Sequence, residues 1–354
     1  MPTIPPSGTV LVSGSNGYIA MWVVRTLLER GYRVRGTVRT EEKIKYMREY
    51  FEELGYAYGE GGKLELVVVE DIVKEGAFDE AVKGVDGVVH MASPLHFNAK
   101  DPQDLYRPAI QGTVGMLKSV TKNGPNVQRI VITSSFSAIM TPPSVPTTVS
   151  EADWNTTSER EVDEQQAQGA LPNGQTIYRA SKKLAESSAW EFYENIKSEV
   201  KWDLTTILPP FAFGPPIHDT SLTSLNASLA LWYVVMSTPK PKELLAGSYL
   251  WIDVRDVALA HVLALEEPEA GGERIIVSAA SYVWQEWLDA LSTLPSNLLP
   301  SHQDKWQRGF PEICDNKVYM ITVNGKQERV LGIKYRTAAE TARDTLVEFA
   351  RRGW

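Results

Sequence analysis

Apolar residues recur along most of the chain with two alternating periods. Short apolar runs predict β-strands at 9–13, 33–38, 64–69, 87–91, 129–133 and 202–208. Apolar residues spaced three and four apart predict helices between them, at 18–29, 41–54, 78–82, 108–122 and 178–196. Strands that alternate with helices in this way predict an α/β fold, a doubly wound parallel sheet with helices on both faces.

The regular alternation stops after residue 136. Residues 136–173 contain several prolines and a polar stretch rich in Glu and Gln, and we expect a long loop without regular structure there. Helical spacing returns at 222–236, 254–265 and 337–351. The pattern predicts a larger domain over residues 1–210, to which residues 240–265 return, and a smaller, partly discontinuous lobe over residues 211–354.

Charge and cysteine content narrow the range of partners. The net charge of −8 disfavours nucleic acid and anionic membrane surfaces, which bind clustered Lys and Arg. No apolar run is long enough to span a bilayer, the first residues lack the features of a signal peptide, and the single cysteine, Cys314, cannot form an internal disulfide. The histidines show no metal-ligand spacing. We therefore expect a cytoplasmic monomer or homodimer that binds a small molecule and no metal, nucleic acid or membrane.

The segment Gly14–Ala20 links the first predicted strand to the first predicted helix with the spacing Gly-x-x-Gly-x-x-Ala. Glycines at 14 and 17 allow a tight turn and a close approach of the backbone to a pyrophosphate, whose charge the helix N-terminus stabilises. A plain glycine-rich turn is the alternative. The position between a strand and an amphipathic helix favours dinucleotide binding in a Rossmann-type domain.

The residues after the second and third strands indicate which dinucleotide binds. NAD enzymes place an acidic residue at the end of the second strand, but Val38 stands there, with Arg39 next and Lys43 close behind. Two cations suit the 2′-phosphate of NADP, although they could also be ordinary solvated surface residues. Asp71, near the end of the third strand, could reach the adenine amino group or could simply cap a helix.

Two further segments have the composition of an acid–base site. Tyr178 and Lys182 lie one helical turn apart, so both head groups can point into one pocket, and a nearby ammonium lowers the pKa of a phenol. Such a tyrosine can donate a proton to a carbonyl oxygen. The triplet Thr133-Ser134-Ser135 ends the fifth strand, on the edge of the sheet where ligands bind, although it could also be a loop cap.

Taken together, the sequence resembles the extended short-chain dehydrogenases/reductases. Within that group it is similar to fungal NADPH-dependent aldehyde and ketone reductases and to plant dihydroflavonol reductases. The resemblance rests on the following features: Gly14–Ala20, Arg39 with Lys43, His90-Met91-Ala92-Ser93-Pro94, Thr133-Ser134-Ser135, Tyr178 to Lys182, and Pro209 with Phe213-Gly214-Pro215.

The resemblance implies a role for each of these residues. Ser135, with Ser134 as the fallback, would orient the carbonyl, Tyr178 would donate the proton, and Lys182 would hold the ribose hydroxyls of the nicotinamide. The implied cofactor site comprises Gly14, Asn16, Gly17, Tyr18, Ile19, Arg39, Lys43, Asp71, Ile72, Ala92, Ser93, Pro94, Thr133, Ser134, Tyr178, Lys182, Pro209 and Phe211. Asp253 and Asp256 resemble a structural segment of the family. Gln111 stands where many relatives have Asn, which puts any water relay through that residue in doubt.

The expected reaction is hydride transfer from NADPH to an aldehyde or ketone, which gives an alcohol. The smaller lobe would bind the substrate, and the aromatic candidates for the pocket are Phe97, Phe136, Phe211 and Trp232. One alternative is a sugar-nucleotide epimerase or dehydratase on the same fold, which the Arg39 and Lys43 pair disfavours. The other is a non-enzymatic NADP-binding redox sensor, which the complete Tyr178 and Lys182 pair disfavours.

Overall fold

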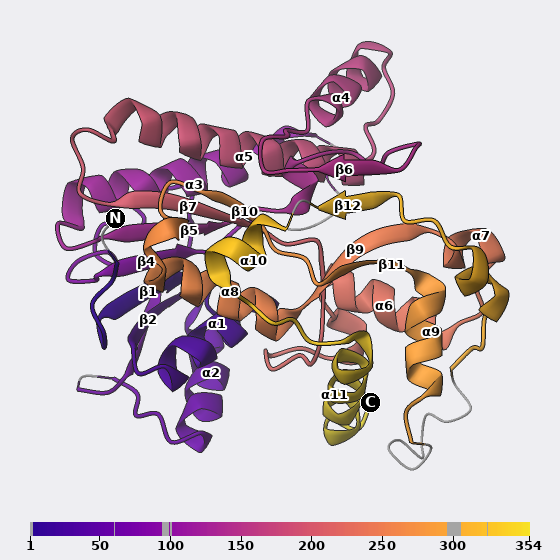
Figure 1. Cartoon of the computed structure of the whole chain (residues 1–354). Coiled ribbons are helices and arrows are strands. Elements are labelled where there is room, and N and C mark those ends of the chain that lie inside the picture. Colours follow the sequence, from indigo (N-terminus) through magenta and orange to yellow (C-terminus); the bar gives the residue numbers. More distant parts are fainter. Residues whose placement is uncertain (1–2, 60, 94–98, 100, 296–305, 324) are drawn as a thin grey trace.

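The computed structural model describes residues 3–59, 61–93, 99, 101–295, 306–323 and 325–354 (Figure 1). Its centre is a seven-stranded sheet with the order β10-β7-β5-β4-β1-β2-β3, and all of its pairs are parallel. The strands are β1 (Thr9–Ser13), β2 (Arg33–Val38), β3 (Leu64–Val68), β4 (Gly87–His90), β5 (Arg129–Thr133), β7 (Asp203–Leu208) and β10 (Arg274–Ile276). The predicted doubly wound sheet is confirmed. Its strand order reverses between β1 and β4, which is where open α/β sheets bind ligands.

Helices cover both faces of this sheet. The long helices α3 (Gln103–Asn123) and α5 (Gly174–Ile196) pack together on one face, and α1 (Tyr18–Glu29) and α8 (Val254–Glu266) pack together on the other. Successive residues of β1 point to opposite faces: Val10 joins the core under α1 and α8, whereas Leu11 joins the core under α3 and α5. Helix α2 (Glu41–Glu53) follows β2. The continuous apolar strands of the sequence are therefore explained by burial on both faces.

Two segments differ from their predicted structure. Residues 78–82 form turns instead of a helix, because Gly76 and Gly84 adopt positive φ angles and interrupt helical backbone on either side of this short segment. The segment 136–173, expected to be irregular, contains a 3-10 turn (Phe136–Ala138), strand β6 (Thr147–Val149) and helix α4 (Thr157–Ala167). Helix α4 packs on α5, and β6 pairs with β12 (Ile321–Val323), so contacts distant in sequence order this segment.

The C-terminal part contributes a second sheet, with the order β11-β9-β8. Its strands are β8 (Phe211–Phe213), β9 (Ser248–Asp253) and β11 (Ala280–Val283). Residues 240–265 were expected to return to the large sheet. Strand β9 instead belongs to the small sheet, whereas α8 packs against α1 on the large one. The strand that returns is the later β10, which pairs with β7. The remaining elements are α6 (Ala227–Ser237), α7 (Lys242–Leu245), α9 (Trp284–Ser292), α10 (Lys326–Leu331), α11 (Ala338–Arg351) and 3-10 turns at Leu222–Ser224, Pro268–Ala270 and Pro311–Asn316.

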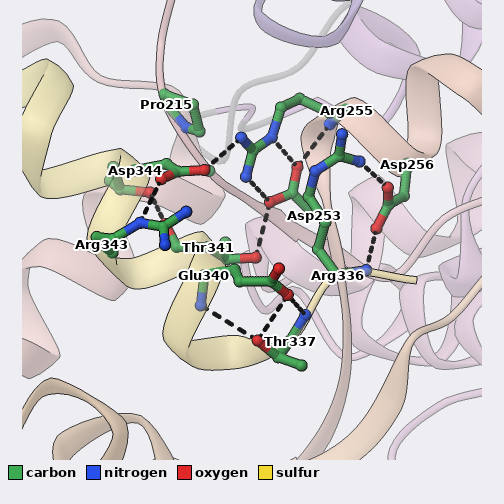
Figure 2. Close-up of polar contacts among 12 residues, drawn as sticks. Pro215, Asp253, Arg255, Asp256, Arg336, Thr337, Glu340, Thr341, Arg343 and Asp344 are labelled. Carbon is green, nitrogen blue, oxygen red and sulfur yellow. Dashed lines mark hydrogen bonds and ion pairs between the residues drawn. The ribbon is translucent and has the colours of Figure 1, made fainter. Parts of the chain in front are cut away.

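A buried polar network ties the C-terminal helix to α8 (Figure 2). Asp253 caps α8 by accepting a hydrogen bond from the backbone N–H of Arg255 at 2.8 Å, and the Thr341 hydroxyl of α11 donates to the same carboxylate at 2.7 Å. Asp256 forms an ion pair with Arg336 and accepts a hydrogen bond from its backbone N–H. Both aspartates therefore stabilise the fold, as expected of the structural segment that they resemble. In the described part of the chain, no helix is long and apolar enough to cross a membrane.

Candidate active site

The carboxyl ends of the central strands and one face of α5 form the site. Gly14 follows β1, Ala92 and Ser93 follow β4, and Ser135 follows β5. Helix α5 begins at Gly174 because Asn173 caps it, its side chain accepting a hydrogen bond from the backbone N–H of Gln175. That start places Tyr178 and Lys182 on consecutive turns beside the strand ends.

The turn between β1 and α1 has the shape that a pyrophosphate requires. Gly14 has φ +62°, a left-handed conformation that favours glycine, and a Cβ on this residue would lie only 3.0 Å from the Cα of Ala92. Gly17 caps α1 without a side-chain hydrogen bond, and the first turn of α1 carries no acidic residue. The backbone N–H groups at this helix start therefore remain available for a phosphate. The turn fits a dinucleotide, as the sequence predicted.

The residues of the turn differ in how they can contribute. Gly14, Asn16, Gly17 and Ile19 are partly exposed. Tyr18 is buried, and its hydroxyl donates a hydrogen bond to the Gly214 carbonyl oxygen at 2.8 Å. The Tyr18 ring thus joins α1 to the segment after β8, and only its backbone is available to a cofactor.

The two cations predicted for the 2′-phosphate have different surroundings. Arg39 is exposed directly after β2 and makes no ion pair with another described residue. Lys43, in the first turn of α2, forms an ion pair with Asp219 at 3.0 Å. The half-exposed Lys43 pair is weak, and Arg39 is the cation with unused hydrogen-bonding capacity.

The residues after β3 have local structural partners. The exposed Asp71 carboxylate accepts a hydrogen bond from the Val73 backbone N–H at 2.9 Å and so stabilises a turn. This local role is similar to the helix cap that was the alternative to adenine binding. Ile72 packs against α3, where a Cβ on Gly112 would lie 2.7 Å from its Cδ1. Gln111 is exposed, and its side-chain oxygen accepts a hydrogen bond from Arg107 of the same helix. Its side chain therefore has its hydrogen-bond partner within its own helix.

The triplet Thr133-Ser134-Ser135 at the end of β5 contributes one hydroxyl to the cavity beside the strand ends. The Thr133 hydroxyl is hydrogen-bonded to His261 Nε2 at 2.7 Å, and the Ser134 hydroxyl donates to the Glu186 carboxylate at 2.7 Å. Ser135 lines a cavity at the strand ends, and its Oγ accepts a hydrogen bond from the Ser137 backbone N–H at 3.1 Å. The geometry favours Ser135 over the fallback Ser134.

Tyr178 reaches the same cavity from α5 and forms a side-chain hydrogen bond with Ser135. Burial raises the pKa of the Tyr178 phenol, and the hydrogen bond with Ser135 acts in the opposite direction. This differs from the sequence-based expectation of a pKa lowered by Lys182. The reason is that the desolvation of the phenol outweighs the stabilisation that its neighbours give to the phenolate. Tyr178 is therefore protonated at neutral pH, as a proton donor must be.

Lys182 is held between the strand end and its own helix. Its ammonium donates a hydrogen bond to the Ser93 hydroxyl at 3.2 Å. Burial lowers the pKa of Lys182 to about 8, and the Glu186 carboxylate one turn further along α5 partly offsets this. At neutral pH the side chain therefore still carries most of its positive charge.

Glu186, which the sequence analysis did not single out, anchors this part of the site. Its carboxylate is 1% exposed and accepts hydrogen bonds from Ser134 at 2.7 Å, Thr206 at 2.8 Å and Arg274 at 2.8 Å. The guanidinium of Arg274 also lies 3.5 Å from the centre of the Trp154 ring. The signal in the sequence was its position one turn after Lys182, on the face of α5 that meets the sheet.

A cavity of about 380 Å³ opens beside the two hydroxyls and has the size of a small-molecule site. Most of its wall is apolar. Its described lining is Ser135, Phe136, Ser137, Met140, Thr141, Pro142, Gln175, Tyr178, Arg179, Pro210, Phe211, Ala227, Ser228, Leu231, Tyr249, Leu250 and Ile321. Among the described residues, no group of three or more His, Cys, Asp or Glu side chains could hold a metal.

Only some of the aromatic residues predicted for the substrate pocket line the cavity. Phe136 and Phe211 line the cavity as expected. Trp232 does not: it is 1% exposed and packs edge-to-face on Trp287 in the core, because its side of α6 faces the small sheet and α9. Pro209 is buried, its carbonyl oxygen accepts a hydrogen bond from the Phe136 N–H, and the next residue, Pro210, reaches the cavity. Phe97 and Pro94 lie outside the described residues.

This combination of an open parallel sheet, a glycine-rich turn at its switch point and a Ser–Tyr–Lys arrangement defines a dinucleotide-binding protein of the short-chain dehydrogenase/reductase class. A model of the NAD dependent epimerase/dehydratase family matches residues 10–280. The chain belongs to this family, whose members are extended short-chain dehydrogenases/reductases. The resemblance drawn from the sequence is thereby confirmed.

Individual relatives are similar over nearly their whole length. Ketoreductase azaE of Aspergillus niger is 38% identical over 341 residues, which cover 92% of this chain and 93% of that protein. The NADPH-dependent methylglyoxal reductase GRE2 of Saccharomyces cerevisiae is 35% identical over 352 residues, covering 95% of this chain and 96% of that protein. The crystal structure of yeast methylglyoxal/isovaleraldehyde reductase Gre2 complexed with NADPH has a TM-score of 0.84 at 32% identity and covers 98% of this chain and 99% of that one.

Proposed function

We propose that this protein reduces an aldehyde or ketone to the alcohol with NADPH, and that Ser135, Tyr178 and Lys182 carry out the chemistry. The observation that carries the proposal is the hydrogen-bonded pair of Ser135 and Tyr178 on the wall of an apolar cavity, beside a turn shaped for a pyrophosphate. Relatives of known activity that align over nearly the whole chain are carbonyl reductases, which favours reduction over the epimerase and sensor alternatives.

Each residue of the site has its own role in the proposed reaction. Bound NADPH would supply the hydride to the carbonyl carbon. Ser135 and Tyr178 hydrogen-bond the carbonyl oxygen, and Tyr178 donates its proton to that oxygen as negative charge develops there. Lys182, whose ammonium donates a hydrogen bond to Ser93, would hold the ribose hydroxyls of the nicotinamide half and would supply the proton that returns to Tyr178. The apolar wall excludes water from the carbonyl, which strengthens both hydrogen bonds.

The cofactor site extends from the same edge. The glycine turn after β1 would hold the pyrophosphate, Arg39 with Lys43 would bind the 2′-phosphate, and Ala92 and Ser93 would contact the nicotinamide half. Asp71 and Ile72 would lie near the adenine. The location in the cytoplasm and the choice between monomer and homodimer stay predictions of the sequence.

Arg39 is expected to set the preference for NADPH. We predict that Arg39→Ala raises the KM for NADPH about 10- to 100-fold and changes the KM for NADH little, because a charge-assisted hydrogen bond to the phosphate is lost. The matched control is Arg33→Ala, which removes the same charge from the opposite end of β2. Steady-state kinetics with both cofactors provide the comparison, and an equal loss with NADH would show that Arg39 does not contact the 2′-phosphate.

The pH profile tests the role of Lys182. Because its pKa is about 8 and that of Tyr178 is raised above the ordinary value, Lys182 is the first of the two to lose its proton as the pH rises. We expect kcat/KM for NADPH to be level near neutral pH and to fall about tenfold for each unit above the Lys182 pKa. A profile that remains level up to about pH 10, the ordinary pKa of a phenol, contradicts this assignment.

The reaction itself is tested by following NADPH absorbance with a panel of aldehydes and ketones. Consumption of NADPH with formation of the alcohol supports the proposal. If the purified protein binds NADPH but reduces no member of the panel, the redox-sensor alternative becomes the better account.

A further inference from the structure

Helix α5 contributes a cation to the wall of the cavity. Arg179 directly follows Tyr178, and Gln175 lies one helical turn before it. All three residues line the same cavity as Ser135. Because positions four apart share a face of a helix, Gln175 and Arg179 form one polar strip next to the reacting hydroxyls.

The guanidinium of Arg179 has no counter-charge of its own. It is half-buried, and it makes no ion pair or hydrogen bond with another described residue. Glu161 of the neighbouring helix α4 attracts it from beyond ion-pair distance, and burial lowers the pKa of Arg179 below its ordinary value. The other arginines buried near the sheet are paired, Arg129 with Asp203 and Arg274 with Glu186. The half-buried guanidinium of Arg179, by contrast, makes no ion pair with another described residue and can take its counter-charge from a bound ligand.

The cavity offers no anion that could fill this role. No Asp or Glu is among the described residues that line it. Apart from Arg179, Gln175 and the hydroxyl groups of its Ser, Thr and Tyr side chains, its wall is apolar, including Met140, Phe211, Leu231 and Ile321. The protein carries a net charge of −8, so an anionic ligand needs a local cation to enter and remain bound. A carboxylate matches the planar guanidinium fork with two parallel hydrogen bonds.

We propose that the substrates this site prefers are oxo acids, that is, aldehydes or ketones that also carry a carboxylate. The carbonyl oxygen meets Ser135 and Tyr178, Arg179 binds the carboxylate, and the apolar wall contacts the carbon skeleton between the two groups. The inference rests on the proposed carbonyl reduction and adds the class of substrate to it. A carboxylate suits the site better than a phosphate, because a single guanidinium on an apolar wall cannot satisfy a dianion.

Matched substrates test the role of the carboxylate. The rates of reduction of 3- and 4-formylbenzoate are compared with those of their methyl esters, which have the same ring and aldehyde but no charge. The enzymes are the wild type, Arg179→Gln, Arg179→Lys and the control Lys183→Gln. Lys183 is on the same helix and pairs with Glu159, and it does not line the cavity, so its loss changes the net charge by the same amount outside the site.

The wild type is expected to reduce at least one acid with a higher kcat/KM than its ester. Arg179→Gln should lower kcat/KM for that acid about 10- to 100-fold, mainly by raising KM, and should leave the ester nearly unchanged. Arg179→Lys should recover part of the loss, since it keeps the charge but not the fork. Lys183→Gln should behave as the wild type.

A carboxylate without a carbonyl provides a second readout. Benzoate should inhibit the reduction of a neutral aldehyde competitively in the wild type and much more weakly in Arg179→Gln. If the ester is the better substrate, or if Arg179→Gln affects acid and ester alike, the oxo-acid inference is wrong and carbonyl reduction stands. If neither the acids nor any neutral aldehyde or ketone consumes NADPH, the proposed function fails, and the inference fails with it.

Discussion

Replacing Tyr178 by Phe is expected to lower kcat about a thousandfold, within the range of about 10²- to 10⁴-fold that general acid catalysis contributes. The substitution removes the hydroxyl that is hydrogen-bonded to Ser135 and keeps the ring that fills the space. KM for NADPH should change little, because Lys182 and the glycine turn are left in place. Steady-state kinetics with NADPH and a neutral aldehyde measure the effect.

Tyr193→Phe is the matched control for that experiment. Tyr193 is on the same helix, packs against Trp190 and Trp202 away from the cavity, and loses the same hydroxyl group. It should retain the activity of the wild type. If Tyr178→Phe also remains active to within a few fold, Tyr178 does not donate the proton, and another acid must be sought among the groups on the cavity wall.

Replacing Asp203 by Ala is expected to lower the free energy of unfolding by about 3–5 kcal/mol, the usual effect of breaking a buried ion pair. Arg129 has no exposed surface, and its guanidinium donates to both carboxylate oxygens of Asp203, at 2.5 and 2.9 Å. It also donates to the carbonyl oxygens of Ala264 and Glu267, so it joins β5 and β7 to the end of α8. Without Asp203, the buried positive charge loses this counter-ion.

The control for this prediction is an ion pair on the surface. Glu194 and Lys197 lie 2.6 Å apart with both side chains about half exposed, so Glu194→Ala should cost less than about 1 kcal/mol. Urea unfolding followed by circular dichroism compares the two variants. The ion pair of Arg129 lies at the opposite end of the strands from Ser135, and kcat of the folded Asp203→Ala protein should match the wild type. A loss of stability no larger than that of Glu194→Ala would refute the structural role assigned to this pair.

The fold was predictable from the sequence because both faces of the sheet are buried. A strand that contributes Val10 to one core and Leu11 to the other is a continuous apolar run, which is easily recognised between helical segments. Segments that depend on distant partners were not predictable. Strand β6 is ordered by pairing with β12, far along the chain, and α4 by packing on α5.

The site was predictable where spacing along one element determines the geometry. The interval between Tyr178 and Lys182 and the position of Gly14 after β1 place these residues together, and the roles assigned to them stay predictions. What the sequence could not supply was the direction of side chains near the sheet edge. Of the three adjacent hydroxyl residues at the end of β5, Ser135 lines the cavity, whereas Ser134 is hydrogen-bonded to Glu186. This difference depends on how α5 packs against the strand.

The burial of the aromatic residues also depends on tertiary packing. Trp232 lies on a helix that is apolar nearly all round, so periodicity could not show which side faces the small sheet. The raised pKa of Tyr178 is another case, since the extent of desolvation follows from burial and not from the interval to Lys182. The expectation of carbonyl reduction with NADPH, by contrast, agrees with the activities of its relatives.

The most direct test of the central claim follows the hydride itself. NADPH carrying deuterium at both C4 positions of the nicotinamide is incubated with the protein and a neutral aromatic aldehyde, and the alcohol is analysed by mass spectrometry and NMR. We predict one deuterium on the carbinol carbon for every NADPH oxidised, with the rate at which this product forms lowered about a thousandfold in Tyr178→Phe. Alcohol without deuterium, or oxidation of NADPH without any alcohol, would contradict direct hydride transfer to the carbonyl at this site.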